Sequence, residues 1–264
     1  MLIIKADGSK EPFDKKKIIR TCSRSGASKK NCILIANKIE KSLYEGITTK
    51  EIYQKTLKEL DSLEPKSSIN YKLREAVSKI PSKKFEIYSK KILEAYNYKC
   101  EWNVIIKGAS IEHQVDLIAK KDKTFLIECK HHKNPHRMSG LGEILQIYAR
   151  LLDIQDGYKQ KKNKYNFSQA WLITNTKISW HARKYSKAKN IILTGWNYPD
   201  TNNLAKLIVS KKVYPITVLK MNEEERRKLM HKNIITIQDI LEKPESVNKS
   251  VLNQIDEILK NNNL

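Results

Sequence analysis

Short apolar stretches alternate with longer polar stretches through the middle of the chain. Apolar residues dominate 115–119 and 125–130, and the polar residues Lys120-Lys121-Asp122-Lys123 separate them. Two strand-length stretches joined by so short a turn predict a β-hairpin. The same patterning predicts further strands at 100–106, 170–174 and 190–196, and helices at 85–98, 141–152 and 180–187. Strands that alternate with helices predict an α/β core with a mixed sheet, from which the lysine-rich stretch 155–169 departs as a surface excursion.

The first 80 residues have a different pattern. Two short apolar stretches flank Asp7-Gly8, a dipeptide that suits the positive φ of a tight hairpin turn. Asp14 then stands where it can cap a following helix. Helical patterns continue over 15–25, 30–43, 49–60 and 70–76. This region is therefore predicted to be a hairpin followed by helices.

The last fifty residues are predicted to be helical. A helix begins at Asn222, residues 233–241 resemble the turn and second helix of a helix-hairpin-helix module, and a further helix covers 250–259. A break at Ile80-Pro81 separates the first two regions. The expected fold is thus a multidomain α+β and α/β protein, with domains at 1–80, 81–212 and 213–264.

The charge of the chain is strongly positive and unevenly distributed. The formal net charge is +22, and basic and acidic residues number 18 and 10 in 1–80, 25 and 11 in 81–212, and 8 and 8 in 213–264. A basic excess concentrated in the middle region favours a polyanionic partner such as DNA, because lysines that neutralise phosphates release counterions. A generally lysine-rich composition with solvated lysine faces explains only part of this excess.

Cysteine usage and hydropathy bear on location. The four cysteines have no short paired spacing, which indicates free thiols in a reducing compartment. No apolar run approaches the roughly 18 residues of a membrane span, and the first residues lack the apolar core of a signal peptide. We therefore expect a cytoplasmic protein without a membrane partner.

The predicted central hairpin carries the chain's main chemical signal. Its strands would place Asp116 and Glu128 side by side, and strand alternation puts Lys130 on the same face as Glu128. Two adjacent carboxylates suit Mg²⁺ or Mn²⁺, whose remaining ligands are water and phosphate. The alternative is a salt-bridge ladder at a strand edge, although charge within apolar strands is costly unless it is paired or metal-bound.

Asp116 and Glu128-Cys129-Lys130 resemble the signature of the PD-(D/E)XK nuclease superfamily, in its Mrr-like and archaeal Holliday-junction-resolvase-like branches. The resemblance implies that Asp116 and Glu128 bind the metal and that Lys130 orients or activates the attacking water. Glu86, a dozen residues before Tyr98, matches a helix glutamate of the resolvase branch that assists the metal shell. Gln146 and Tyr148 match positions on the helix after the motif in Mrr-like nucleases.

A basic loop follows the motif. Four of its residues are expected to contact nucleic acid, namely His131, His132, Lys133 and Arg137. No Cys/His quartet with zinc-finger spacing is present, so these histidines do not predict a zinc site.

Other residues admit two interpretations. His113 could orient the metal shell or contact phosphate, or be structural. Trp196 and Tyr198 could stack on a base, or belong to the core.

The N-terminal region resembles an ATP-cone, the nucleotide-sensing module of ribonucleotide reductases. The match runs from Leu2 to about Ile80 and includes the hairpin, Phe13-Asp14 and the Tyr44-Glu45-Gly46-Ile47 step. The resemblance implies binding of ATP or dATP by three residues, namely Lys5, Lys17 and Thr49. Ala6 stands where the family usually has an arginine, so a folded cone that no longer binds nucleotide is the alternative.

These observations predict a Mg²⁺-dependent endodeoxyribonuclease, acting as a homo-oligomer on double-stranded or branched DNA and regulated by ATP or dATP. One alternative is a nucleotide-responsive DNA-binding regulator whose nuclease fold is inactive. The other is a structure-specific resolvase or DNA-repair nuclease.

Overall fold

The structure, a computed structural model, describes residues 1–5 and 7–260, and its chain forms two compact units. The first contains residues 1–73 and the helix at 249–260, and the second contains residues 74–248. Each unit has its own cluster of buried apolar side chains. Ala6, the departure from the cone pattern, lies outside the described residues.

The first unit begins with the predicted hairpin. Strands β1 (Leu2–Ile4) and β2 (Lys10–Pro12) pair antiparallel, with Ile3 opposite Glu11. Gly8 has a φ of +81°, the left-handed conformation for which glycine has no steric penalty. The turn expected at Asp7-Gly8 is confirmed.

Helices complete the first unit. They are α1 (Lys15–Arg24), α2 (Lys29–Lys41), α3 (Thr49–Leu63), the first part of α4 (Pro65–Ser78), and α11 (Lys249–Lys260). Asp14 caps α1 by accepting the backbone N–H of Lys16 at 2.8 Å, as predicted. Ile35 and Leu60 are fully buried in the core of this unit. The closing helix predicted at 70–76 begins earlier, at Pro65, a residue well suited to a first helical turn.

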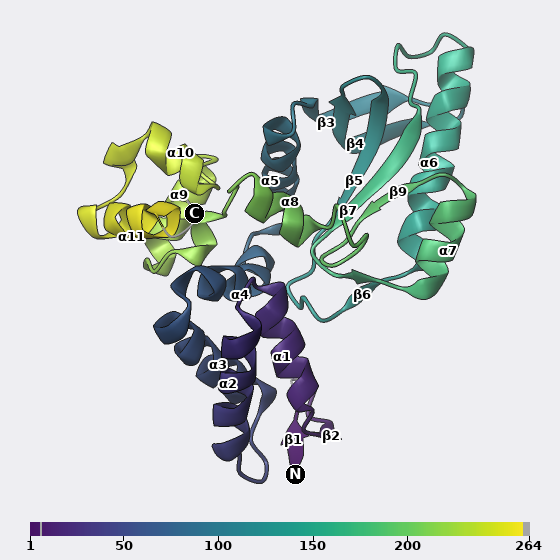
Figure 1. Cartoon of the computed structure of the whole chain (residues 1–264). Coiled ribbons are helices and arrows are strands. Elements are labelled where there is room, and N and C mark those ends of the chain that lie inside the picture. The colour runs from purple at the N-terminus through teal and green to yellow at the C-terminus, as the bar shows by residue number, and fades with distance from the viewer. Residues whose placement is uncertain (6, 261–264) are drawn as a thin grey trace. The chain divides into compact units, whose positions relative to one another are not determined.

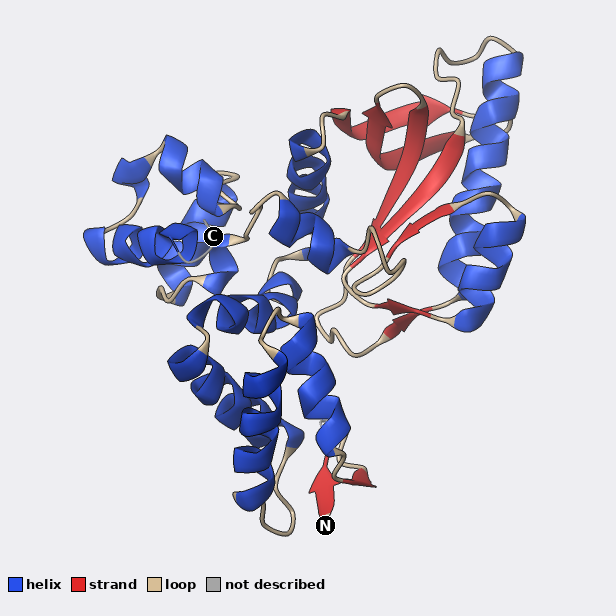
Figure 2. Ribbon diagram, in the orientation of Figure 1, coloured by secondary structure: helices blue, strands red, loops and turns tan. Residues whose placement is uncertain are grey.

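The second unit is built on a mixed sheet of strand order β3-β4-β5-β7-β9, drawn in red in Figure 2. The strands are β3 (Lys99–Lys107), β4 (Glu112–Lys120), β5 (Thr124–Lys130), β7 (Gln169–Thr174) and β9 (Ile192–Thr194). The first three pair antiparallel, and β7 and β9 continue the sheet parallel to β5. The predicted mixed sheet and the central hairpin are therefore confirmed.

Helices cover both faces of this sheet. Helix α5 (Ser82–Ala95) lies on one face, and α6 (Leu141–Lys159) and α7 (Trp180–Ala188) lie on the other (Figure 1). The prediction for residues 155–169 was wrong over its first part, because α6 continues to Lys159. Ile154 and Gly157 are buried on this extension, so packing rather than lysine content decides where the helix ends.

The second unit also contains the short parallel pair of β6 (Met138–Ser139) and β8 (Lys177–Ile178), and helices α8 (Leu204–Ser210), α9 (Glu223–His231) and α10 (Ile237–Glu242). Residues after β9 contact α5. The Tyr88 hydroxyl on α5 donates to the Val213 carbonyl at 2.7 Å, and Lys91 pairs with Asp239 at 2.6 Å. Residues 213–248 thus belong to the second unit, whereas α11 belongs to the first.

Two further expectations can be compared with the described residues. All four cysteines are free thiols, as predicted. Over residues 1–5 and 7–260, every helix is too short or too polar to cross a membrane.

Candidate active site

The central hairpin places the two predicted carboxylates together. Leu117 on β4 pairs with Ile127 on β5, and the same register continued by one residue sets Asp116 opposite Glu128. The backbone N–H of Cys129 donates to Asp116 Oδ2 at 2.8 Å. The alternation of strand side chains brings Glu128 and Lys130 to the same face, as the sequence predicted.

Glu128 is buried, with 6% of its surface exposed, and is surrounded by cations. Lys130 Nζ lies 2.6 Å from its Oε1, and Arg150 on α6 pairs with its Oε2 through Nη1. Burial of a charged carboxylate is sustained by such pairing. Arg150 was not predicted from the sequence. The available signal was its position one helical turn after Gln146, on the same face of α6.

Asp116 is in a contrasting environment. Burial, the adjacent charge of Glu128 and the more distant charge of Glu86 together raise the pKa of Asp116 to about 6, although the Cys129 N–H acts in the opposite direction. Like charges held close together in a partly buried site disfavour ionisation of both. A divalent cation would relieve that repulsion, so the pair is suited to metal binding.

Glu86 lies near this pair without joining it. Its Oε2 accepts the indole N–H of Trp102 at 2.9 Å and is 3.3 Å from Lys83 Nζ. Its predicted part in the metal shell stays a prediction. Over the described residues, no three His, Cys, Asp or Glu side chains are grouped closely enough to hold a metal ion. The fit therefore rests on Asp116 and Glu128, and two carboxylates are a usual protein contribution to a Mg²⁺ site.

The four loop residues expected to contact DNA differ in their exposure. His131 is partly buried, where its Nε2 lies 3.1 Å from the Val77 carbonyl and its ring packs on Phe85. Burial lowers the pKa of His131, which favours the neutral ring. Lys133 and Arg137 are exposed and remain available to a polyanion.

His132 is held by a side chain from the bend that follows β7. Asn175 accepts the His132 backbone N–H at 2.9 Å and donates to its carbonyl at 2.8 Å. This paired contact fixes the chain two residues after Lys130. The His132 ring is partly buried, and burial lowers its pKa.

His113 takes the structural alternative. Its Nε2 lies 2.7 Å from Asp153 Oδ2, and the same carboxylate accepts the backbone N–H of Ser110 at 2.9 Å. These bonds hold the pKa of Asp153 well below its usual range. His113 and Asp153 therefore connect the β3–β4 turn to α6.

Tyr148, Tyr185 and Tyr198 are partly buried and pack against the core of the second unit. Tyr148 and Tyr198 contact its apolar core, and Tyr148 meets Tyr185 edge to face at 6.1 Å. The Arg183 guanidinium lies over the Tyr198 ring at 4.5 Å, and that of Arg74 lies 6.0 Å from Trp196. Tyr148 and Tyr198 thus serve packing, whereas Gln146 is exposed.

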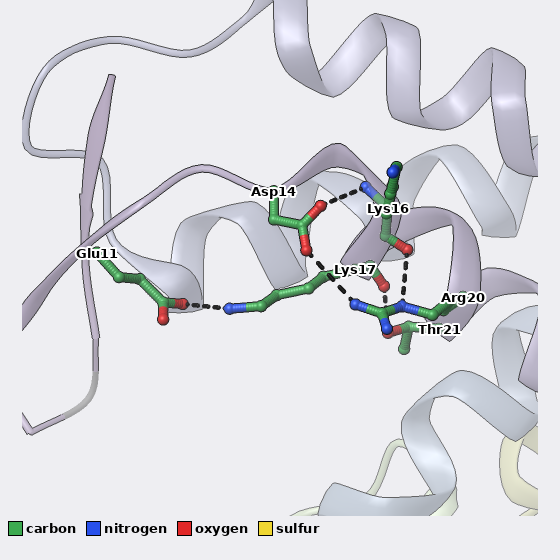
Figure 3. A network of polar contacts seen from close by, with 6 residues as sticks. All are labelled: Glu11, Asp14, Lys16, Lys17, Arg20 and Thr21. Carbon is green, nitrogen blue, oxygen red and sulfur yellow. Dashed lines mark hydrogen bonds and ion pairs between the residues drawn. The ribbon is translucent and has the colours of Figure 1, made fainter.

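Of the predicted nucleotide residues of the first unit, Lys17 pairs with another side chain of the chain. Figure 3 shows Lys17 reaching back to the hairpin, where its Nζ lies 2.9 Å from Glu11 Oε1. Asp14 in the same network contacts Arg20 at 3.4 Å. Lys5 lies in the hairpin turn, where its backbone N–H donates to the Ser9 carbonyl at 2.8 Å.

Thr49 is the first residue of α3, as predicted, and its helix end is already capped. Thr48 accepts the Glu51 N–H at 3.1 Å, and Glu51 accepts the Thr48 N–H at 3.1 Å, forming a capping box. The Tyr44 hydroxyl also donates to Glu51. A carboxylate of the chain therefore occupies the helix end expected to receive a triphosphate.

Family models match almost the whole chain. The model described as a restriction endonuclease matches residues 77–208, which is half of the chain. The model for an ATP cone domain matches residues 1–83, and the one described as AF1548-like, C-terminal matches residues 214–263.

Comparisons with a curated protein and with a solved structure also find similarity. An uncharacterized protein from Archaeoglobus fulgidus is 36% identical over 152 residues, which cover 57% of this chain and 82% of the relative. The crystal structure of a protein of unknown function, AF1548, is similar with a TM-score of 0.53 and 30% identity, covering 68% of this chain and 96% of that one. The chain thus belongs to the restriction endonuclease family, with an ATP cone domain before its nuclease fold and an AF1548-like domain after it.

Proposed function

We propose that the protein is a Mg²⁺- or Mn²⁺-dependent endodeoxyribonuclease that hydrolyses phosphodiester bonds of DNA. One observation carries the proposal. Asp116, Glu128 and Lys130 lie together on adjacent strands of a restriction endonuclease fold. A salt-bridge ladder alone does not account for Asp116, which lies beside another carboxylate and has a raised pKa.

The three residues would have different roles. Asp116 and Glu128 would hold the divalent ion, which when bound would polarise the phosphate and lower the pKa of a water molecule. The Lys130 ammonium, 2.6 Å from Glu128, would orient the attacking water and offset negative charge that develops on the phosphate. Cys129 supplies the backbone N–H that orients Asp116.

DNA as the substrate is supported by charge. Residues 81–212 contain 25 basic and 11 acidic residues, and Lys133 and Arg137 on the loop after the motif are exposed. Such an excess supports electrostatic binding of a phosphate backbone without specifying a sequence. Double-stranded and branched DNA are both compatible with it.

We further propose that ATP or dATP regulates the enzyme through the cone, and that the enzyme acts as a homo-oligomer. Lys5, Lys17 and Thr49 would contact the nucleotide. Lys17 would exchange Glu11 for a phosphate, and that exchange lowers the affinity by the cost of breaking the ion pair. A nucleotide alters activity only through unequal affinity for two states of the protein.

Cleavage assays with carboxylate variants test the proposal. Asp116→Asn and Glu128→Gln are incubated with supercoiled, linear and branched DNA and Mg²⁺, beside Glu94→Gln as a control on the exposed part of α5. We expect both site variants to lose cleavage while the control retains it. Wild-type rates in both site variants would overturn the proposed site. A wild-type protein that binds DNA without cutting it would instead support the DNA-binding regulator.

A further inference from the structure

A cation outside the sequence motif reaches the carboxylate expected to bind metal. Arg150 on α6 contacts Glu128 Oε2, while Lys130 contacts Oε1 at 2.6 Å. Both oxygens of Glu128 are therefore paired with cations of the chain. A divalent ion that binds Glu128 therefore competes with these two cations for the carboxylate.

Most N–H donors of Arg150 have no partner among the described residues. A guanidinium carries five N–H donors. Within residues 1–5 and 7–260, only Nη1 of Arg150 has an ion-pair or hydrogen-bond partner. The side chain is 25% exposed and its remaining nitrogens are open to solvent. Arg150 thus keeps a donor edge free beside the hairpin.

Arg150 also lines a shallow hollow of about 470 Å³ between the β3–β4 turn and α6. Its lining residues are Ser110, Ile111, His113, Gln146, Ala149, Arg150 and Asp153. Asp153 is the acidic group there, and both of its oxygens accept hydrogen bonds from the turn or from His113. Its charge therefore stabilises the turn, and Arg150 supplies an uncommitted cationic edge.

We propose that Arg150 exchanges partners during the reaction cycle, leaving Glu128 when the divalent ion binds and then contacting a phosphate of the DNA strand in this hollow. This inference rests on the proposed nuclease function. The planar guanidinium fork matches a phosphate in two-point contact, which a lysine ammonium cannot reproduce. Glu128 remains neutralised throughout, first by Arg150 and then by the metal. Metal binding and DNA binding thereby favour each other.

Metal titration without DNA tests the first half of the exchange. Mn²⁺ is titrated calorimetrically into the full-length protein, its Arg150→Gln variant and Lys159→Gln, a control near the end of the same helix. Removal of a hydrogen-bonded competitor should tighten Mn²⁺ binding by about tenfold in Arg150→Gln and leave the control unchanged. Affinity equal to or weaker than wild type in Arg150→Gln would overturn the exchange.

DNA binding tests the second half. Fluorescence anisotropy is measured over a range of KCl concentrations with Ca²⁺ as the divalent ion, and a gel verifies that the DNA stays intact. Loss of one phosphate contact should reduce the slope of log affinity against log salt by about 1 in Arg150→Gln. An unchanged slope would exclude the phosphate contact.

Two outcomes separate this inference from the proposed function. Wild-type cleavage with normal Mn²⁺ affinity and an unchanged salt slope in Arg150→Gln would refute the exchange alone. Failure of the wild-type protein to bind Mn²⁺ would refute the metal-dependent nuclease and the exchange with it. If Arg150→Gln has a lowered melting temperature, Arg150→Lys replaces it. The DNA affinity of Arg150→Lys should fall several-fold, and an affinity equal to that of the wild type would refute the two-point contact with phosphate.

Discussion

The two regions expected to bind phosphate-bearing ligands differ in how their key charges are used. In the nuclease domain, Asp116 lies beside Glu128 and its pKa is raised to about 6. In the cone, Lys17 pairs with Glu11, and Glu51 caps the helix that Thr49 begins. In the nuclease site the ionisation of Asp116 is thus opposed by burial and by neighbouring carboxylates, whereas in the cone Lys17 and the N-terminus of α3 already have partners within the chain.

This difference indicates which ligand each region can accept at low cost. A divalent ion entering the hairpin offsets the repulsion between the two carboxylates and competes with the cations paired with Glu128. A nucleotide entering the cone must break the Lys17–Glu11 pair and approach a helix end that Glu51 already occupies. We therefore expect tight, essential metal binding and weaker nucleotide binding.

Beyond the two carboxylates, the largest effect is expected at Lys130. Lys130→Ala should reduce Mg²⁺-dependent cleavage by about 10²- to 10³-fold, because it removes the cation that we propose orients the attacking water. Lys17→Ala in the cone should leave cleavage without nucleotide unchanged. Initial rates of plasmid nicking provide the measurement, and full activity in Lys130→Ala would remove this residue from the mechanism.

Metal affinity should depend on pH in the range set by Asp116. A carboxyl group must lose its proton to bind a metal. Because the pKa of Asp116 is about 6, Mn²⁺ affinity should be constant above that pH and fall by up to about tenfold per pH unit below it. Calorimetry between pH 5 and pH 8 measures this. An affinity that does not change over this range would contradict the raised pKa, and Asp116→Asn should lack the dependence.

The environment that raises the pKa of Asp116 should also lower the stability of the folded protein at neutral pH. Folding raises the pKa of Asp116 to about 6, so between about pH 4 and pH 6 the native state holds a proton that the unfolded state has lost. Stability therefore falls as the pH rises through this range and stays lowered above it. Asp116→Asn should therefore raise the free energy of unfolding by about 1–3 kcal/mol at pH 8. The gain should disappear near pH 4, where wild-type Asp116 is protonated. Urea unfolding at both pH values measures the difference, and a loss of stability at pH 8 would contradict it.

The smallest effect is expected in the cone. Glu11→Gln frees Lys17 from an exposed ion pair, which is worth at most about 1 kcal/mol, so ATP or dATP should bind up to about fivefold more tightly. Calorimetry on the full-length protein measures this, with Glu40→Gln as a control that frees Lys15 instead. If neither wild type nor Glu11→Gln gives heat at millimolar nucleotide, the cone is a scaffold.

The sequence was most informative where neighbouring residues decide the structure. The alternation in β4 and β5 and the short turn between them fixed which residues face each other, and so placed Asp116 beside Glu128. The Asp14 cap depends on a residue only two positions away. Such features follow from backbone geometry over a few residues, so a pattern along the chain suffices to predict them.

Only the tertiary structure decided the partners of these side chains. Arg150 meets Glu128 because α6 packs on the face of the sheet that carries Leu126 and Ile118, and no local pattern reveals that contact. His131 turns inward to Val77, although its place in a basic loop predicted exposure to DNA. These contacts join residues 22 and 54 positions apart. Their formation depends on how whole elements pack, because burial of apolar faces determines which charged groups are brought together.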